Sequence, residues 1–302
     1  MPENRGTLPK SLWPGVKAWW GADYKDYPEI CRQIFEMRTS KMAFEEDVQI
    51  TSMSAAPVKD EGGSTSYDNI GQGYTTRYTH VAYSNGFIVT REQFADNQYA
   101  KVARARTKAL SKSFRVTKET VAANILNRAT NGSYTGADGV TLLNTAHPEK
   151  VGTFSNRLAV AADLSESSLE DLMILIMTAT DSVGDPIMIK PKRLIIPPQL
   201  AFEATRITKS VLQSGTANND TNAMREMGLL QEDPIIWNYL TDPDAFFVQT
   251  DAPEGMIGYQ REAREIKREG DFDTDNLKVK GYERYSFGYT DPRCLYGSPG
   301  AG

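Results

Sequence analysis

The sequence predicts an α+β fold, and three observations predict it. An uninterrupted helical pattern extends over residues 96–128, strand-like stretches lie at 43–54 and 74–90, and a long strand pattern lies at 277–290. The chain has 302 residues, of which 40% are hydrophobic and 24% are charged. This is the composition of a folded protein rather than a disordered one.

The clearest element is a helix from Asp96 to about Arg128. Apolar residues recur there at three-, four- and seven-residue spacings, and neither Gly nor Pro interrupts the stretch. At 1.5 Å per residue, ~33 residues form a rod of roughly 50 Å. A compact chain of this length has a radius of gyration of only about 19 Å, so we expect the helix to span the molecule.

Basic residues in this helix recur at intervals of 3, 4, 4 and 3, which predicts a basic face opposite the apolar one. The five residues are Lys101, Arg104, Lys108, Lys112 and Arg115. Two interpretations stay open at this point. The face is either solvated or paired with acidic neighbours, or it contacts nucleic-acid phosphates without reading the base sequence.

The stretches at 43–54 and 74–90 are rich in β-branched and aromatic residues, and the polar segment 56–64 between them contains a glycine pair. They predict a two-stranded ribbon. Such a ribbon is marginal in water by itself, so we expect it to lie on something else. The strand at 277–290 would extend about 46 Å, because each residue adds ~3.3 Å, and could run beside the long helix.

Residues 1 to about 30 are predicted to form an arm, because prolines recur there. Trp13, Trp19 and Trp20, three of the four tryptophans, lie in this segment. They either pack into the chain's own core or anchor the arm on a neighbouring subunit, since aromatic anchors dominate interface energies.

From Asp163 onward, helices and strands alternate. The sequence predicts a buried helix from Ser165 or Ser167 to about Asp181, with Glu170 completing a capping box for Ser167. It then predicts a strand at 193–196, a helix after the proline pair that follows, and strands at 235–240 and 246–250.

Composition and motifs argue against several function classes. A net charge of −5 does not suit a protein whose whole surface coats nucleic acid. The longest strongly apolar run, Leu172–Met177, is far shorter than the ~20 residues of a membrane span. The first residues lack the apolar core of a signal peptide, so we expect a cytosolic chain without a membrane partner.

Chemistry-bearing motifs are also missing from the sequence. It contains no phosphate-binding loop, dinucleotide fingerprint, zinc-protease motif or nucleophile elbow. Cys31 and Cys294 lie at opposite ends of the chain, and two unrelated thiols are expected. Two cysteines and two histidines are too few for a soft-metal site. We therefore expect no catalytic residues, no cofactor and no metal.

Short motifs along nearly the whole chain match a known family in order and spacing. The segments are Trp13–Val16, Trp19–Gly21, Phe44–Asp47, Lys59–Gly62, Thr120–Ala129, Leu240–Asp244 and Glu283–Gly288. In these segments the sequence resembles the Mu-like prophage major head subunit family, a branch of the tailed-phage major capsid proteins. Each motif is weak alone, but their order together is fairly specific.

The resemblance implies the tailed-phage major capsid fold. Its parts would be an N-terminal arm at 1–40, an extended ribbon called the E-loop at 41–90, and a peripheral (P) domain at 91–162 with a spine helix. Residues 271–302 would complete the P domain, and 163–270 would form the axial (A) domain.

The resemblance also implies a function. Such proteins self-assemble into hexamers and pentamers of an icosahedral phage head that encloses double-stranded DNA. The implied partners are further copies of the chain, a scaffold, a maturation protease, DNA bound without sequence preference, and portal and decoration proteins. Assembly would take place in the bacterial host cytoplasm, and the protein would reside in the virion capsid.

Candidate contact residues follow from these expectations. The basic helix face would point inward toward DNA. Contacts between subunits would involve Trp13, Trp19, Trp20 and the ribbon residues Lys59, Asp60 and Glu61. A ribbon and an arm bury little of themselves, so their backbone edges and aromatic side chains would be satisfied by other copies.

Two alternatives remain. An encapsulin-like compartment would have the same fold but hold protein cargo instead of nucleic acid. A cytosolic enzyme with an active site in 163–270 would stay a small oligomer, whereas a capsid protein forms particles or capsomers of megadalton scale.

Overall fold

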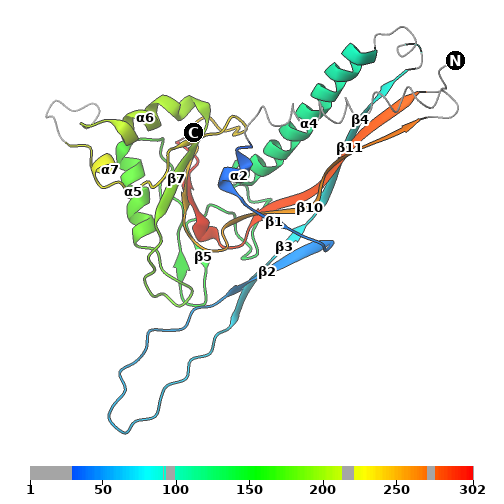
Figure 1. Cartoon of the computed structure of the whole chain (residues 1–302). Helices are drawn as coiled ribbons and strands as arrows, with labels where there is room; N and C mark the ends of the chain where they lie inside the picture. The colour runs from blue at the N-terminus through cyan, green and yellow to red at the C-terminus, as the bar shows by residue number, and fades with distance from the viewer. Residues whose placement is uncertain (1–28, 91, 93–98, 213–220, 271–275, 302) are drawn as a thin grey trace. The chain divides into compact units, whose positions relative to one another are not determined.

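A computed structural model describes residues 29–90, 92, 99–212, 221–270 and 276–301 (Figure 1). The side chains of residues 99–102 are not among those described. The chain divides into two compact units. The first contains residues up to Glu45, Tyr78–Ala122 and Gly258–Phe287, and the second contains Glu46–Arg77, Ala123–Ile257 and the residues from Gly288 onward.

The first unit contains a four-stranded sheet in the order β1-β10-β11-β4. Its strands are β1 (Glu36–Thr39), β10 (Met256–Gly270), β11 (Leu277–Tyr289) and β4 (Val81–Val89). Strands β4 and β11 are antiparallel, with Leu277 opposite Val89 and Tyr285 opposite Val81.

Helix α4 (Tyr99–Asn127) contributes most of its length to this unit and lies along the sheet (Figure 1). Its Leu110 and Phe114 pack against Phe87 of β4 and Ile266 of β10. A short helix, α2 (Cys31–Ile34), precedes β1.

The second unit has its own sheet, in the order β12-β9-β7-β8. The strands are β7 (Pro191–Ile196), β8 (Ile235–Ile236), β9 (Phe246–Thr250) and β12 (Leu295–Ser298). The helices of this unit and its remaining short elements are α5 (Glu166–Met177), η1 (Pro198–Leu200), α6 (Ala201–Lys209), α7 (Ala223–Glu226), η2 (Pro292–Cys294), β5 (His147–Pro148) and β6 (Thr153–Phe154).

One apolar core joins the helices of the second unit to its sheet. Leu172 and Ile176 of α5, Ile207 of α6, and Leu194 and Val248 of the sheet are all buried in it. Burying a large aliphatic side chain contributes about 1.5–3 kcal/mol, so this cluster is a major source of the unit's stability.

Strands β2 (Phe44–Ile50) and β3 (Gln72–Thr79) pair with each other in a two-stranded sheet. The residues between them, 51–71, have no helix or strand, and every residue from 53 to 70 is exposed. We call residues 44–79 the ribbon.

Several sequence predictions are confirmed. The predicted helix at 96–128 is α4, the predicted strand at 277–290 is β11, and the predicted strand at 246–250 is β9 with the same bounds. The strand predicted at 193–196 starts two residues earlier, at Pro191, and the helix after the proline pair is η1 followed by α6.

Other predictions are corrected. The second ribbon strand, predicted at 74–90, is two strands: β3 ends at Thr79, and β4 starts at Val81 and pairs with β11 instead of with β2. The strand predicted at 235–240 is only two residues long. After it, Trp237 is fully buried and its amide donates to the Ile196 carbonyl, and the chain then turns.

The predicted start of α5 is confirmed for one of its two candidate caps, and its capping-box partner is corrected. Ser165, rather than Ser167, is the N-cap, and it exchanges hydrogen bonds with Ser168 instead of Glu170. The Ser165 hydroxyl accepts from the Ser168 amide, and the Ser165 amide donates to the Ser168 hydroxyl, so a short side chain replaces the expected acid. The helix ends at Met177, before the predicted Asp181.

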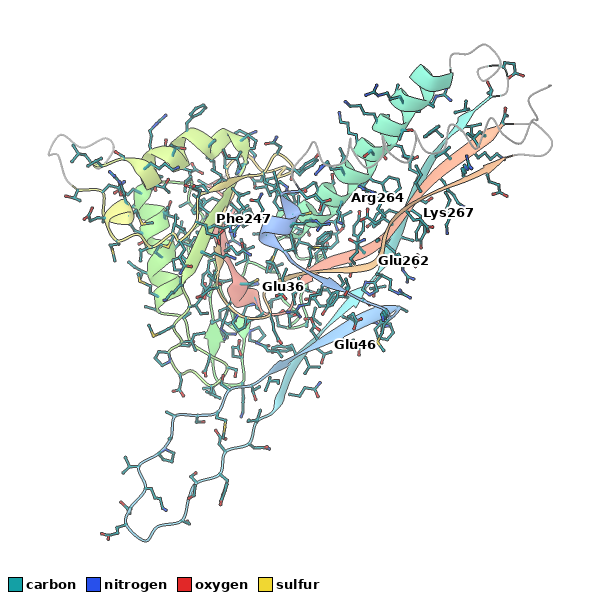
Figure 2. The ribbon with its side chains drawn as sticks, in the orientation of Figure 1. Glu36, Glu46, Phe247, Glu262, Arg264 and Lys267 are labelled. Carbon is teal, nitrogen blue, oxygen red and sulfur yellow. The ribbon has the colours of Figure 1, made fainter. Side chains whose placement is uncertain are left out.

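The sequence prediction missed β10, one of the two longest strands. Its first four residues are buried, but from Ala263 to Glu269 exposed and half-buried residues alternate, and most of these are charged. Figure 2 shows this charged strand, with Glu262, Arg264 and Lys267 labelled. A run of charges does not have the β-branched, apolar composition that identifies a strand.

Candidate functional surfaces

The two cysteines and the potential metal ligands of the described residues do not come together in a metal site. Within them, no group of three or more His, Cys, Asp or Glu side chains is placed to hold a metal ion. Cys31 and Cys294 are both buried and unbridged, and burial raises the pKa of each thiol well above its usual range. A thiol that stays protonated is a poor nucleophile. None of the described helices is long and apolar enough to cross a membrane.

The predicted basic face exists in part. Arg104, Lys108 and Lys112 are exposed on α4, and their four-residue spacing places them on one side of the helix over about 12 Å. The side chain of Lys101 lies outside the described residues. We call Arg104, Lys108 and Lys112 the basic face.

Arg115 corrects the prediction, because it is only 6% exposed. By helical geometry it belongs on the same side as Arg104, yet it is buried, and the chain near α2 contacts the next turn of the helix. Glu119, one turn further along, accepts from the backbone amide of Cys31 at 3.2 Å through each carboxylate oxygen. A contact between residues 88 positions apart in the sequence cannot be deduced from helical spacing.

Another basic residue of α4, Lys118, is buried and connects the helix to its sheet. Lys118 is 2% exposed, and its Nζ lies 3.0 Å from Glu283 Oε1 on β11 and 2.8 Å from Gln260 Oε1 on β10. The ammonium group also lies 5.4 Å from the centre of the Tyr285 ring. These contacts join the helix to two strands of its sheet, and a buried charge is tolerated because it is paired.

The outer part of the ribbon exposes apolar side chains that a self-contained protein would bury. Met53, Val58, Tyr67 and Ile70 are 52%, 96%, 93% and 55% exposed. Several large apolar side chains left exposed on one projecting segment are typical of an interaction site. The predicted contact residues Lys59, Asp60 and Glu61 lie at the turn of this segment and are exposed. Trp13, Trp19 and Trp20 lie outside the described residues.

Hydrogen bonds hold the base of the ribbon within the second unit. The Ser52 amide donates to Ser182 Oγ and the Ala55 amide donates to Asp185 Oδ2, both at 3.0 Å. The Tyr74 hydroxyl donates to the Pro148 carbonyl at 3.1 Å. The base of the ribbon is therefore hydrogen-bonded to the rest of its unit, whereas the apolar side chains of the outer part are exposed to solvent.

A buried histidine lies where the chain leaves the ribbon. His80 follows β3 directly, and its ring nitrogens lie 2.9 Å from Ser286 Oγ and 3.1 Å from Ser40 Oγ. The Ser40 hydroxyl donates its hydrogen to Glu45 at 2.6 Å, so it must accept from His80 Nε2–H. Nδ1 is then the acceptor for the Ser286 hydroxyl. Burial and the nearby Arg284 lower the pKa of His80, in agreement with a neutral ring.

Solved structures with the same fold are capsids and related particles. The capsid of an empty GTA particle has a TM-score of 0.58 and 10% identity over 91% of this chain and 90% of that chain. A structure from Microbacterium phage Oxtober96 has a TM-score of 0.56 and 9% identity, over 90% of this chain and 91% of that chain. A virus-like particle from Pyrococcus furiosus has a TM-score of 0.54 and 12% identity, over 94% of this chain and 97% of that chain. This likeness establishes the phage capsid fold and confirms the predicted fold class.

The family follows from the sequence itself. The model of the phage capsid protein family matches residues 73–298, about three quarters of the chain, so the chain belongs to this family. No curated protein matches it. The chain is a major capsid protein that builds an icosahedral shell from many copies of itself. The surfaces that decide its function are therefore those that meet other copies.

Proposed function

We propose that this chain is the major head subunit of a tailed phage of the Mu-like branch, forming the hexamers and pentamers of a head that encloses double-stranded DNA. The observation that supports this most strongly is the ribbon, whose residues 53–70 are all exposed although several are large and apolar. Large apolar side chains exposed along such a segment gain little in a lone protein and can be buried in one that assembles.

The ribbon corresponds to the E-loop of the proposed architecture. In the assembled shell its turn, with Lys59, Asp60 and Glu61, contacts a neighbouring subunit, and Trp13, Trp19 and Trp20 of the arm anchor a further contact. The predicted bounds are 1–40 for the arm, 41–90 for the E-loop, 91–162 with 271–302 for the P domain, and 163–270 for the A domain. Because β4 and β10 both lie in the sheet with β11, we place these two strands in the proposed P domain and limit the E-loop to the ribbon. Several weak contacts per subunit add up to a stable shell.

The basic face is proposed to line the shell interior, where it contacts DNA phosphates without sequence preference. Three exposed cations over about 12 Å match a polyanion better than a single ion. In the test, Lys108→Glu should reduce nuclease-protected DNA in assembled particles, whereas Lys41→Glu, at another exposed lysine of the first unit, should not. Equal retention in both variants would contradict this role.

The proposal includes partners and a place of assembly. Subunits assemble in the bacterial host cytoplasm with a scaffold and a maturation protease, and the finished shell accepts portal and decoration proteins. The protein acts as a structural subunit and has no catalytic activity of its own.

One alternative has an observation in its favour. The virus-like particle from Pyrococcus furiosus has a similar fold, so the fold alone does not determine what a shell contains. An encapsulin-like shell would hold protein and no nucleic acid.

One experiment tests the proposal and this alternative together. The purified chain is expressed alone and examined by light scattering and negative-stain microscopy, and particles formed in phage-infected or induced cells are analysed for contents. We expect capsomers or shells of megadalton mass, and DNA inside the particles formed in cells. A small oligomer at all concentrations would contradict the proposed function, and protein-filled shells without DNA would favour the alternative.

A further inference from the structure

Two helices of the second unit expose side chains on the side facing away from their shared core. On α5 these are Asp171, Ile174 and Met177, and on α6 they are Phe202, Arg206 and Lys209. Ile174, Met177 and Phe202 are 54%, 48% and 78% exposed. The opposite sides of both helices supply buried residues to the core. The outer sides thus have large apolar groups that the described part of the chain leaves uncovered.

The order of the groups along the two helices is complementary. The outer side of α5 is acidic at its middle and apolar at its end, whereas that of α6 is apolar near its start and basic near its end. From Asp171 to Met177 the rise is about 9 Å, and from Phe202 to Lys209 it is about 11 Å. The two patterns therefore have nearly the same length.

Only an antiparallel arrangement of the two helices pairs opposite charges with each other and apolar groups with each other. It places Asp171 beside Arg206 and Lys209, and it places Ile174 and Met177 beside Phe202. A parallel arrangement would put the acid beside the phenyl ring and Met177 beside Lys209.

The charged groups in these patterns remain available to a partner. Arg206 lies 3.0 Å from Glu203 and Lys209 lies 3.0 Å from Asp233, but all four side chains are substantially exposed. Exposed ion pairs of this kind contribute about 0–1 kcal/mol, so exchanging them for contacts across an interface costs little.

We propose that α5 of one subunit docks antiparallel on α6 of a second copy of the chain. This inference rests on the proposed function, which supplies the second copy. Because it joins two different surfaces, the contact is heterologous, and it repeats around a ring of subunits where the rotation closes. It assigns residues of the second unit to self-assembly, in addition to the ribbon.

A charge exchange tests the pairing. Asp171→Lys and Arg206→Glu each place like charges opposite one another, so each should raise the protein concentration needed for assembly by about tenfold. The double variant restores opposite charges and should return to within about threefold of the unmodified protein. Glu254→Lys and Lys190→Glu reverse exposed charges elsewhere in this unit and should leave assembly unchanged. Thermal melting of unassembled chains verifies that each variant is folded.

Covalent trapping gives an independent result. Chains with Ile174→Cys are mixed with chains with Phe202→Cys, assembled and oxidised. Disulfide-linked dimers should form only in the mixture, since both natural cysteines are buried.

The outcomes separate this inference from the proposed function. Single variants that assemble like the controls, or a double variant no better than the worse single variant, would overturn the pairing even though shells form. An unmodified chain that never assembles would refute the proposed function, and the pairing with it.

Discussion

The core of the second unit and the outer part of the ribbon contain similar side chains in opposite environments. Leu172 and Ile176 of α5 are completely buried, whereas Val58 and Tyr67 of the ribbon are more than 90% exposed. Both regions belong to the same unit. The difference separates apolar groups that stabilise the subunit's own fold from those that are exposed in the lone chain and that we propose contact other copies. Mutations in the two regions should therefore fail in different ways.

The largest effect is expected from the buried ion pair of the first unit. Lys118→Met leaves Glu283 buried without its cation, and breaking such a pair costs about 3–5 kcal/mol. Urea unfolding of the unassembled chain should reveal this loss. Lys112→Met, which removes an exposed lysine of the same helix, should change stability by no more than about 0.5 kcal/mol. Similar losses in both variants would show that Lys118 is not specifically required.

A cavity in the core of the second unit should cost nearly as much. Leu172→Ala removes a fully buried side chain, and such changes cost about 2–5 kcal/mol because the cavity collapses only partly. The measurement is the free energy of unfolding. Ile174→Ala, two residues further along the same helix, alters an exposed side chain and should cost far less. It should instead weaken assembly if the proposed docking of α5 is correct.

A pH-dependent effect is expected at His80. Burial lowers its pKa below the ordinary value of about 6.5, so the unfolded chain takes up this proton before the folded chain does. The stability contributed by the neutral ring is fully present above about pH 6.5 and is lost as the pH falls through the lower pKa of the folded state. His80→Gln should lose less stability between pH 7.5 and pH 5 than the unmodified chain.

The unfolding curves of the two proteins would be compared at several pH values. Because every other residue is the same in both proteins, the difference between the curves reports on His80 alone. Parallel curves over the whole range would mean that protonation of His80 is not linked to folding.

The smallest effect on stability, together with a clear effect on assembly, is expected in the ribbon. Val58→Ser and Tyr67→Ser change side chains that contact little in the lone chain, so the free energy of unfolding should move by no more than about 0.5 kcal/mol. Assembly measured by light scattering should weaken. Loss of stability instead of assembly would mean that the ribbon supports its own subunit.

The local features of the fold could be predicted from the sequence. Helix α4 was recognisable because its periodicity and its lack of Gly and Pro are properties of one stretch, and β9 and β11 because β-branched and aromatic residues mark strands. Strand β10 was missed because its outer half is a run of charges that resembles a solvated segment. The break between β3 and β4 at His80 was missed because both sides have the same composition.

The candidate surfaces were harder to predict, because burial depends on partners distant in sequence. Arg115 has the correct spacing for the basic face, yet it is buried. Lys118 has its partner Glu283 165 residues away, and no spacing rule connects them. The complementary outer sides of α5 and α6 become visible only once the core has fixed which side of each helix faces outward.

Hydrogen exchange at residues 53–70 tests the central claim most directly. Unassembled chains and purified shells would be compared by mass spectrometry under identical conditions. The account predicts rapid exchange of these amides in the free chain and marked protection in the shell, because neighbouring copies cover the segment. Amides already protected in the free chain, or still unprotected in intact shells, would contradict it.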